Sequence, residues 1–584
     1  MTDFATRKDK ELKWNGWGYK DSYFFFGKDD HIYFAGKGRY EISGEVLPRL
    51  RNFMNDLGVE LNYTKPAQPV ENMEAMIGEP VRNAPFVAFL EQHDIAHSFD
   101  KKHRLRRGHG HTMEEIYQLR HGKFSRLPDV VVWPKNHDEV VLLVSAANTH
   151  DVSIIPIGGG TSVSLALQCP VNESRMIVSL DTAKMNRLLW IDKDNLIARM
   201  EAGCVGIDLE NQLNDEGFTL GHEPDSIEFS TVGGWVATRA SGMKRGKYGN
   251  IEDLLVHVTL VTPTGVMQKS CQAPRISSGP DLNHLILGSE GTLGVVTEAT
   301  FKIFKKPEYK RYGSIVFPNF ERGVKCMREI TKQKCGAASM RLVDNKHFVI
   351  GQSFKKGPLT LWRRFMEQVE HLYITAWKKF DPNEVCAMTL VFEGSEEEIK
   401  VQEQKIFQIS ASFGGFFGGV ESGRYGYVLT YSIAYLRDLG LEYSCVGESM
   451  ETSVSWDKLL PLCKNVQELF KRESEKLGVH YVAAYRVTQA YDAGACVYMY
   501  YVFNYRNIEH PVETYERIEA MAREVILASG GSISHHHGVG KLRRKWLPVT
   551  VGDAGLSTLQ AVKQSLDPNN IFACGNLFEV QAKL

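Results

Sequence analysis

The chain has 584 residues, of which 43% are hydrophobic and 24% charged, a size at which two or more domains are expected. Its formal net charge of -1 at pH 7 lacks the basic excess that is typical of nucleic-acid-binding proteins, so we expect no nucleic-acid partner. The 10 cysteines are scattered without a Cys-x-x-Cys pair, which argues against a zinc ribbon and against a disulfide framework.

Residues 1–124 have a mixed pattern with aromatic patches, and we predict an irregular or helical lead-in that wraps on the rest of the chain. A basic cluster stands at its end, for which we favour a solvated loop; the alternative is contact with anionic lipid head groups or phosphate. The cluster comprises Lys101, Lys102, Arg104, Arg106 and Arg107. No apolar run of about 18 residues is present, so we expect no membrane-spanning helix.

A strand–helix–strand unit opens the next segment, 125–306. Val130–Trp133 predicts a short buried strand that ends at Pro134. Asn136 precedes Glu139 by three residues, a capping-box spacing that predicts a helix start. Ser153–Ile157 predicts a second strand. Near the end of the segment, the alternation over Val295–Ile303 predicts a half-buried strand, with a domain boundary at Lys305–Pro307.

The segment 307–558 has an α+β pattern. Cys496–Tyr505 predicts a strand with Tyr498, Tyr500 and Val502 on one face. Pro511–Ser529 predicts a helix that ends before Gly530. Residues 559–584 form a closing segment, in which Leu559–Phe572 predicts a helix and a turn.

Three glycine-containing loops follow one another in the chain. Neither of the common nucleotide-loop motifs, G-x-G-x-x-G after a strand or G-x-x-x-x-G-K-[ST], is present. Instead Gly158, Gly159 and Gly160 follow a predicted strand, and three bare residues let backbone N–H groups turn inward to hold a pyrophosphate. The other two loops run from Asp225 to Gly242 and from Gly288 to Val296.

In this order and spacing the three loops resemble the flavin domain of the vanillyl-alcohol-oxidase family. The resemblance implies an α+β fold, with a two-subdomain FAD-binding domain at 125–306 and an α+β cap domain at 307–558. Many relatives tether FAD through a histidine beside the glycine loop, where this chain has Thr161, so we expect non-covalent FAD. The residues implied to line FAD are Pro156, Ile157, Gly158, Gly159, Gly160, Thr161, Ser162, Asp225, Ser226, Ile227, Glu228, Phe229, Ser230, Thr231, Thr238, Arg239, Ala240, Ser241, Glu290, Gly291, Thr292, Leu293, Gly294, Val295 and Val296.

Four further motifs resemble the alkyl-dihydroxyacetone-phosphate synthase family, over about residues 12–578. They are Lys13–Tyr19, His222–Ser226, Tyr491–Cys496 and Ser534–Lys541. That family replaces the acyl chain of acyl-dihydroxyacetone phosphate with a long-chain alcohol. The products are an ether-lipid precursor and a fatty acid. The family's proposed mechanism passes through an adduct at flavin N5 without net redox change.

The resemblance implies catalytic roles for Tyr498 and for the triplet His535, His536 and His537. Tyr498 matches the family's acid/base tyrosine; Tyr500 is its local competitor, and from the strand pattern alone both would be packing aromatics. Adjacent side chains of an extended segment point to opposite faces, and no Cys, Asp or Glu stands beside the triplet in sequence. We therefore predict no metal site, and neutral imidazoles that relay a proton or bind the leaving carboxylate or incoming alcohol.

Cations are needed for the substrate phosphate. Arg437 matches the family's substrate-binding arginine, and Arg341 matches an arginine needed for activity near the flavin. For a single arginine, a surface ion pair is the commoner role. His222 opens the second loop and is a further candidate for substrate binding.

The tail Ala582–Leu584 matches the small-basic-Leu pattern of a peroxisomal address, so we expect recognition by the peroxisomal import receptor and a location on the lumenal side of the peroxisome. Substrates drawn from a membrane favour peripheral membrane contact. The resemblance implies a homodimer, and contact with the acyltransferase that supplies the substrate is a further expectation.

Two other interpretations stay open from the sequence. One is a flavin-dependent 2-hydroxy-acid dehydrogenase, which shares the flavin domain but reduces FAD. The other is a non-catalytic flavin-fold scaffold, against which the presence of Tyr498, Arg341, Arg437 and the His triplet argues.

Overall fold

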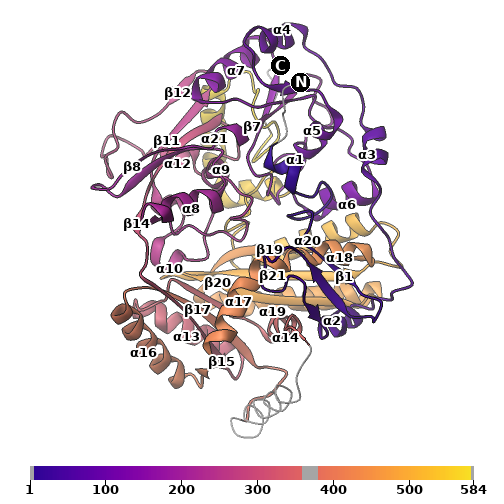
Figure 1. The fold of residues 1–584 in the computed structure, drawn as a ribbon, viewed down its shortest axis with the longest axis vertical. Coiled ribbons are helices and arrows are strands. Elements are labelled where there is room, and N and C mark those ends of the chain that lie inside the picture. Colours follow the sequence, from indigo (N-terminus) through magenta and orange to yellow (C-terminus); the bar gives the residue numbers. More distant parts are fainter. Residues whose placement is uncertain (1–5, 358–378, 580–584) are drawn as a thin grey trace.

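The computed structural model describes residues 6–357 and 379–579. Figure 1 shows two halves, one above the other, with the N-terminal segment running beside both. The upper half contains two main sheets and the short antiparallel pair of β10 (Phe218–Thr219) and β14 (Phe304–Lys305), and the lower half is built on one large sheet.

The first sheet of the upper half has four strands in the order β4 (His97–Ser98), β5 (Val130–Val132), β7 (Ile177–Asp181) and β6 (Ser153–Ile157). β5, β7 and β6 are parallel, as the crossover helix α7 (His137–Thr149) requires. The Asn136 side chain accepts the Glu139 N–H at 3.0 Å, so the predicted helix start is confirmed. The Glu139 carboxylate instead accepts the N–H of Lys135, so the reciprocal half of the predicted capping box is absent here.

The second sheet is antiparallel, in the order β12 (Gly265–Met267), β11 (Leu255–Thr262), β13 (Val295–Lys302), β9 (Ile197–Glu201) and β8 (Leu188–Asp192). The predicted half-burial of β13 is wrong, because only Glu298 is half-buried and only Lys302 is exposed. Val295 packs in the core that includes α7, whereas Val296 packs in the core that includes α9 (Val232–Thr238). Both faces of the strand are therefore covered.

The lower half is an antiparallel seven-stranded sheet. Its order is β18 (Phe416–Phe417), β15 (Tyr309–Phe317), β17 (Cys386–Gly394), β16 (Ser339–Val343), β20 (Tyr481–Ala490), β21 (Gly494–Asn504) and β19 (Cys445–Ser455). The helices α13 (Phe320–Lys332), α16 (Glu396–Ser412), α19 (Trp456–Leu477) and α20 (Pro511–Ala528) pack with it in the largest hydrophobic core. The predicted strand at 496–505 and helix at 511–529 are both confirmed, with shifted ends.

The N-terminal segment is more regular than predicted. Its aromatic run forms β1 (Tyr23–Phe26), which pairs with β2 (Ile32–Ala35), and β3 (Val46–Leu47) completes a small sheet. Phe24 and Phe34 pack in one core with Tyr435, so this sheet is anchored to the lower half. Short helices flank it, namely α1 (Arg7–Glu11), α2 (Leu50–Asp56), α3 (Val70–Met76), α4 (Ala84–Gln92), α5 (Lys101–Arg106) and α6 (Met113–His121).

The favoured interpretation of the basic cluster as a solvated loop is wrong. Lys101–Arg106 forms α5, and Arg104 and Arg107 are buried. Arg107 pairs with Asp9 at 2.7 Å and with Asp181 at 2.8 Å, while Arg104 donates to the Pro128 carbonyl. These arginines join the N-terminal segment to the upper half and do not face solvent.

The closing segment also differs from the prediction. Its helix α21 (Leu547–Leu566) begins well before Leu559, with a break in helical geometry at Gly552, where φ is 69°. Ile571 and Phe572 are buried in the core of the four-stranded sheet, so the chain returns to the upper half. The tail tripeptide lies outside the described residues.

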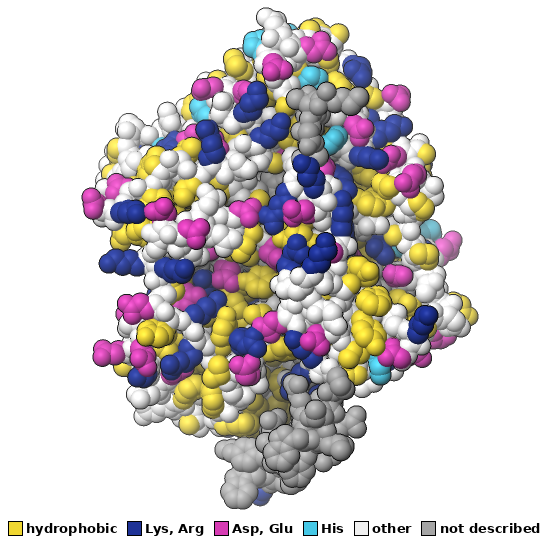
Figure 2. Space-filling view, viewed as in Figure 1, with side chains coloured by type: hydrophobic (Ala, Val, Ile, Leu, Met, Phe, Trp, Pro, Cys, Tyr) yellow, Lys and Arg dark blue, Asp and Glu magenta, His cyan; other side chains and the backbone are white. Residues whose placement is uncertain are grey.

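Among the described helices, none combines the length and apolar character that crossing a bilayer requires. On the face in Figure 2, Lys and Arg side chains are interspersed with Asp and Glu over both halves.

Candidate functional site

A cavity of about 510 Å³ lies between the two halves. Its upper wall is made by three groups of loop residues, from Ile155 to Val163, from Pro224 to Met243 and from Ser289 to Val296. Its lower wall is made by side chains of β16, β19, β20 and β21, including Arg341, Arg486 and Tyr498. The three sequence-predicted loops are thus brought together around one space.

The glycine loop has no room for side chains. A Cβ at Gly158 would lie 2.1 Å from Thr231 Oγ1, and one at Gly159 would lie 2.1 Å from the Phe229 carbonyl oxygen. The first loop therefore packs with its bare backbone on the second, and its peptide groups line the cavity. Peptide groups without side chains along a cavity wall suit a pyrophosphate, so the residues fit FAD.

Most residues that were predicted to line FAD do line the cavity, and a few do not. Arg239 and Glu228 point away: the Arg239 guanidinium lies 3.7 Å from Glu252, and Glu228 accepts a hydrogen bond from Tyr40. Phe229 packs edge-on against Trp17. Ile227, Thr292 and Leu293 also fall outside the cavity wall. All three loops therefore reach the cavity, but the sequence did not predict which residues of each loop face it.

Glu451, Tyr498 and Arg486 form a row across the cap sheet. Tyr498 of β21 stands directly opposite Glu451 of β19 and opposite Arg486 of β20. The Tyr498 Oη lies 2.6 Å from His537 Nε2, and the Arg486 guanidinium lies 4.9 Å from the centre of the Tyr498 ring. Burial raises the pKa of Tyr498 well above 10, so the phenol is neutral and stays within hydrogen-bond distance of His537.

Glu451 holds the histidine loop in place. Its carboxylate accepts the backbone N–H groups of His535, His536 and His537 and the hydroxyl of Ser534. Burial alone would raise the pKa of Glu451, but its pairing with His537 and the charge of Arg523 hold that pKa well below 4.5. The Nδ1 of His537 lies 3.7 Å from Glu451 Oε1. Glu451 was missed in the sequence because it is 84 residues away from the loop that it binds.

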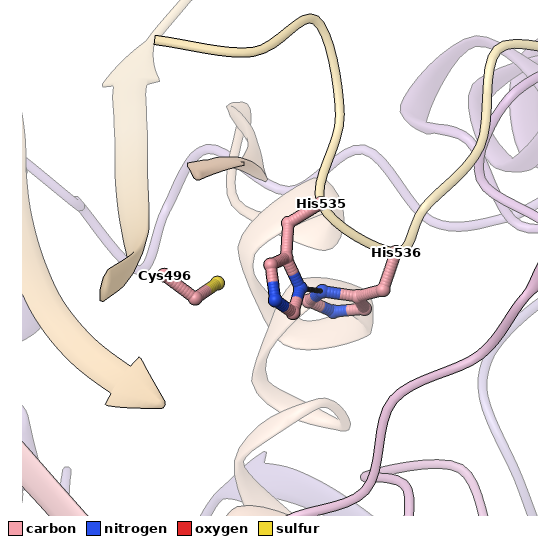
Figure 3. A group of neighbouring side chains, drawn as sticks. All are labelled: Cys496, His535 and His536. Atoms are coloured by element: carbon pink, nitrogen blue, oxygen red, sulfur yellow. Dashed lines mark hydrogen bonds between the residues drawn. The ribbon is translucent and has the colours of Figure 1, made fainter. Parts of the chain in front are cut away.

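The prediction of no metal site assumed that no Cys stands near the His triplet. In the fold, however, Cys496 lies close to His535 and His536. Figure 3 shows the Cys496 sulfur directed toward the two rings. His535 Nδ1 and His536 Nδ1 are, however, only 2.9 Å apart, which is a hydrogen-bond distance. Burial raises the pKa of the Cys496 thiol, which keeps it protonated. The geometry is that of a hydrogen-bonded pair of rings beside a neutral thiol.

The arginines differ from their predicted roles. Arg341 lines the cavity and donates to Thr430 Oγ1 at 2.6 Å. Arg486, which sequence reasoning missed, pairs with Asp225 at 3.2 Å, and the same carboxylate lies 3.9 Å from Arg341. Two buried cations thus share one anion beside Tyr498. In the sequence, Arg486 could have been recognised as a candidate site residue because it is an arginine among apolar residues at an inward position of β20.

Arg437 and His222 are placed less directly. Arg437 lines the cavity, but it already donates to the His111 carbonyl at 2.6 Å. His222 is buried against Trp235 and is not part of the cavity wall. Neither of its ring nitrogens has a hydrogen-bond partner among the described residues. His222 therefore lies outside the cavity wall, and its role in substrate binding stays a prediction.

The N-terminal motif reaches the same cavity. Trp17 lines it and packs edge-on against His111, and the Trp17 N–H donates to Asp438. Phe53 and Leu57 add to an apolar part of the wall. This segment, predicted only as a lead-in, therefore helps to close the site.

Comparisons with known proteins agree with this architecture. Residues 128–270 match the FAD binding domain model, and residues 306–577 match the model of the C-terminal domain of FAD linked oxidases. A crystal structure of p-cresol methylhydroxylase, 15% identical, has the same fold with a TM-score of 0.64 over 86% of this chain and 97% of its own. The protein is an FAD-dependent enzyme with the fold of the vanillyl-alcohol-oxidase family.

Closer relatives narrow the assignment. Alkyldihydroxyacetonephosphate synthase of Caenorhabditis elegans is 54% identical over 98% of this chain and 96% of its own length. A solved structure of an alkyldihydroxyacetonephosphate synthase, 28% identical, superposes with a TM-score of 0.85 over 98% of this chain and 99% of its own. The chain belongs to the alkyldihydroxyacetonephosphate synthase family.

Proposed function

We propose that this enzyme exchanges the acyl chain of acyl-dihydroxyacetone phosphate for a long-chain alcohol, releasing a fatty acid and an ether-lipid precursor. The observation that carries the proposal is the hydrogen-bonded pair of Tyr498 and His537, with Glu451 behind it, facing the cavity that the glycine loop also lines. The full-length similarity to the nematode synthase supports the same reaction.

The reaction needs a group that removes a proton from the carbon beside the ester oxygen. The Tyr498 phenol passes its own proton to His537 Nε2 as its oxygen takes the proton from carbon. The negative charge of Glu451 stabilises the imidazolium that forms on His537. FAD, held by the three loops, would supply an electron-accepting ring, and the complete exchange would leave it oxidised.

An anionic substrate fits the charge of the lower wall. Arg341 and Arg486 together carry two positive charges, and Asp225 offsets one of them. The surplus cation lies in a buried site, where an anion is bound more strongly than in water. We assign the phosphate or the leaving carboxylate to these two arginines, with Arg437 further along the wall. The apolar wall near Phe53 and Leu57 suits an alkyl chain.

The cellular setting belongs to the same proposal. We place the protein in the peroxisome as a homodimer that contacts the membrane peripherally and meets the acyltransferase that supplies its substrate. A fluorescent fusion, compared with the same fusion lacking Ala582–Leu584, tests the import signal: loss of peroxisomal signal supports it and unchanged import contradicts it. Sedimentation of the purified protein with and without anionic vesicles tests the dimer and the membrane contact.

The reaction itself is tested by incubating the purified holoenzyme with palmitoyl-dihydroxyacetone phosphate and radiolabelled hexadecanol. We expect label in a base-stable phospholipid and an oxidised flavin spectrum after turnover. Absence of label transfer would contradict the proposal. Loss of flavin absorbance on anaerobic addition of D-lactate would instead favour a 2-hydroxy-acid dehydrogenase.

A further inference from the structure

His535 and His536 are linked to a second chain of hydrogen bonds that ends outside the triplet. His535 Nε2 lies 2.6 Å from Tyr491 Oη, and the Tyr491 hydroxyl lies 2.7 Å from Gln489 Oε1. Gln489 Nε2 donates to the Gly242 carbonyl at 2.9 Å. Asn250 Nδ2 donates to Tyr491 Oη, also at 2.9 Å. This series of hydrogen bonds thus runs from the second cofactor loop to the histidines.

The direction of every bond in this chain is determined at its outer end. The Gly242 carbonyl only accepts, so it fixes the Gln489 amide with Oε1 toward Tyr491. Tyr491 has one proton, and Oε1 takes it. Tyr491 Oη therefore accepts at its remaining contacts, and the proton between Tyr491 and His535 belongs to His535 Nε2.

The tautomer of His536 follows from that of His535. Burial lowers the pKa of His535 to about 3, so its ring is neutral and carries one proton, on Nε2. His535 Nδ1 is then a bare acceptor, and the hydrogen bond of 2.9 Å to His536 Nδ1 requires the proton on His536. Burial also lowers the pKa of His536, so this ring is neutral as well, with Nε2 unprotonated.

His536 lines the cavity, and among the described residues no hydrogen-bond partner of its Nε2 is found. His537 differs, because its Nε2 is already engaged by Tyr498. The charged groups that act on His536 are Glu451 and Asp225, which favour its protonated form, and Arg486 and Arg543, which oppose it. His537 is thus hydrogen-bonded to Tyr498, whereas His536 has an unprotonated Nε2 at the cavity wall.

We infer that His536 Nε2 is the base that takes the proton of the incoming alcohol, and that Tyr491 is a positioning residue that fixes the His536 tautomer through His535. This assignment rests on the proposed exchange reaction. The alcohol oxygen forms the bond to the carbon of dihydroxyacetone phosphate, its proton passes to His536 Nε2, and the fatty acid leaves as a carboxylate with the electron pair of the broken C–O bond. The proton then leaves His536 for solvent.

Tyr491→Phe removes the acceptor for His535 Nε2–H without changing the ring that packs there. The His535 proton is then free to move to Nδ1, which makes His536 Nδ1 the acceptor and shifts the His536 proton to its Nε2. We expect ether formation to fall by at least about tenfold, a modest share of what a general base contributes. Exchange of the substrate carbon-bound proton with solvent, measured without alcohol, falls much less, because it uses Tyr498 and His537. Tyr481→Phe, a half-buried tyrosine of the same sheet, is the matched control and leaves both rates unchanged.

Two further measurements keep the inference testable if Tyr491→Phe alters stability. In the holoenzyme labelled with ¹⁵N-histidine, the His536 resonance, assigned with His536→Ala, shows an unprotonated Nε2 in the wild type and a protonated one in Tyr491→Phe. In His536→Ala, added imidazole restores part of the ether formation, and the rescue grows with pH as the neutral form of imidazole increases.

Three results would overturn the inference: a protonated His536 Nε2 in the wild type, equal losses of ether formation and proton exchange in Tyr491→Phe, or ether formation in that variant at the wild-type rate. The ¹⁵N measurement does not depend on turnover. A wild-type protein without acyl-to-alkyl exchange would therefore contradict the proposed function, while the tautomer would still be decided.

Discussion

Glu451→Gln tests the electrostatic centre of the site. The carboxylate accepts three backbone N–H groups and one hydroxyl, and an amide turns one of its two oxygens into a donor. At least one charge-assisted hydrogen bond is lost, which costs about 1.5–3 kcal/mol, and the facing donors then repel each other. With a slope of about 2–4 °C per kcal/mol for a domain of this size, we expect the unfolding temperature at pH 7 to fall by roughly 3–12 °C.

The contribution of Glu451 to folding stability depends on pH with a definite sign. Because its pKa in the folded protein is depressed, Glu451 stabilises the fold above about pH 4.5, and this contribution is lost as the pH falls through the depressed value. The difference between wild type and Glu451→Gln is therefore largest near neutral pH and shrinks in acid. Ether formation falls by about 10²-fold or more, because the imidazolium on His537 loses its counter-charge.

Glu448→Gln is the matched control. Glu448 lies on the same strand and lines the cavity as a half-buried residue, but burial raises the pKa of Glu448 to about 8, so this carboxyl is protonated at pH 7. A raised pKa lowers stability progressively from about pH 4.5 to pH 8, and an uncharged amide avoids that cost. Glu448→Gln is thus expected to match or exceed the wild-type unfolding temperature at pH 7. Flavin fluorescence and circular dichroism of the holoenzymes measure both variants, and equal losses in the two would refute the reasoning.

Three more predictions concern the cofactor and the cations. Gly159→Ala forces a Cβ onto the Phe229 carbonyl and should abolish FAD retention on gel filtration. Gly351→Ala, at a helix position with open space, should leave FAD retention unchanged. Equal FAD retention in the two variants would contradict the role of the glycine loop in FAD binding. Acid precipitation of the holoenzyme should release all flavin into the supernatant, and flavin in the pellet would show a covalent link. Arg486→Met should raise KM for acyl-dihydroxyacetone phosphate by at least about tenfold, as expected for a buried charge-assisted contact, with a smaller effect on kcat; an unchanged KM would remove Arg486 from the substrate site.

The sequence predicted the parts of the fold that are governed by local pattern. The strand at 153–157 and the helix predicted at 511–529, which ends at Ala528, follow from local pattern, and the glycine loop follows from three consecutive glycines. The half-burial of β13 was predicted wrongly, because only the tertiary structure places a helix core against each face of that strand.

The candidate site was predicted where a motif marks it and missed where distant residues complete it. Tyr498 and the His triplet came from resemblance, and the structure brings them together. Glu451 and Arg486 were missed because only the strand register of the cap sheet places them beside Tyr498. Trp17 was missed because nothing in the N-terminal pattern shows that it reaches across to the cavity.

We propose that Tyr498 and His537 initiate the acyl-to-alkyl exchange in this cavity. The most direct measurement compares wild type and Tyr498→Phe for solvent exchange of the substrate carbon-bound proton and for transfer of radiolabelled hexadecanol, at matched FAD content. We expect both rates to fall by about 10²-fold or more in the variant, since both require the same proton transfer. Proton exchange at the wild-type rate in Tyr498→Phe would contradict it.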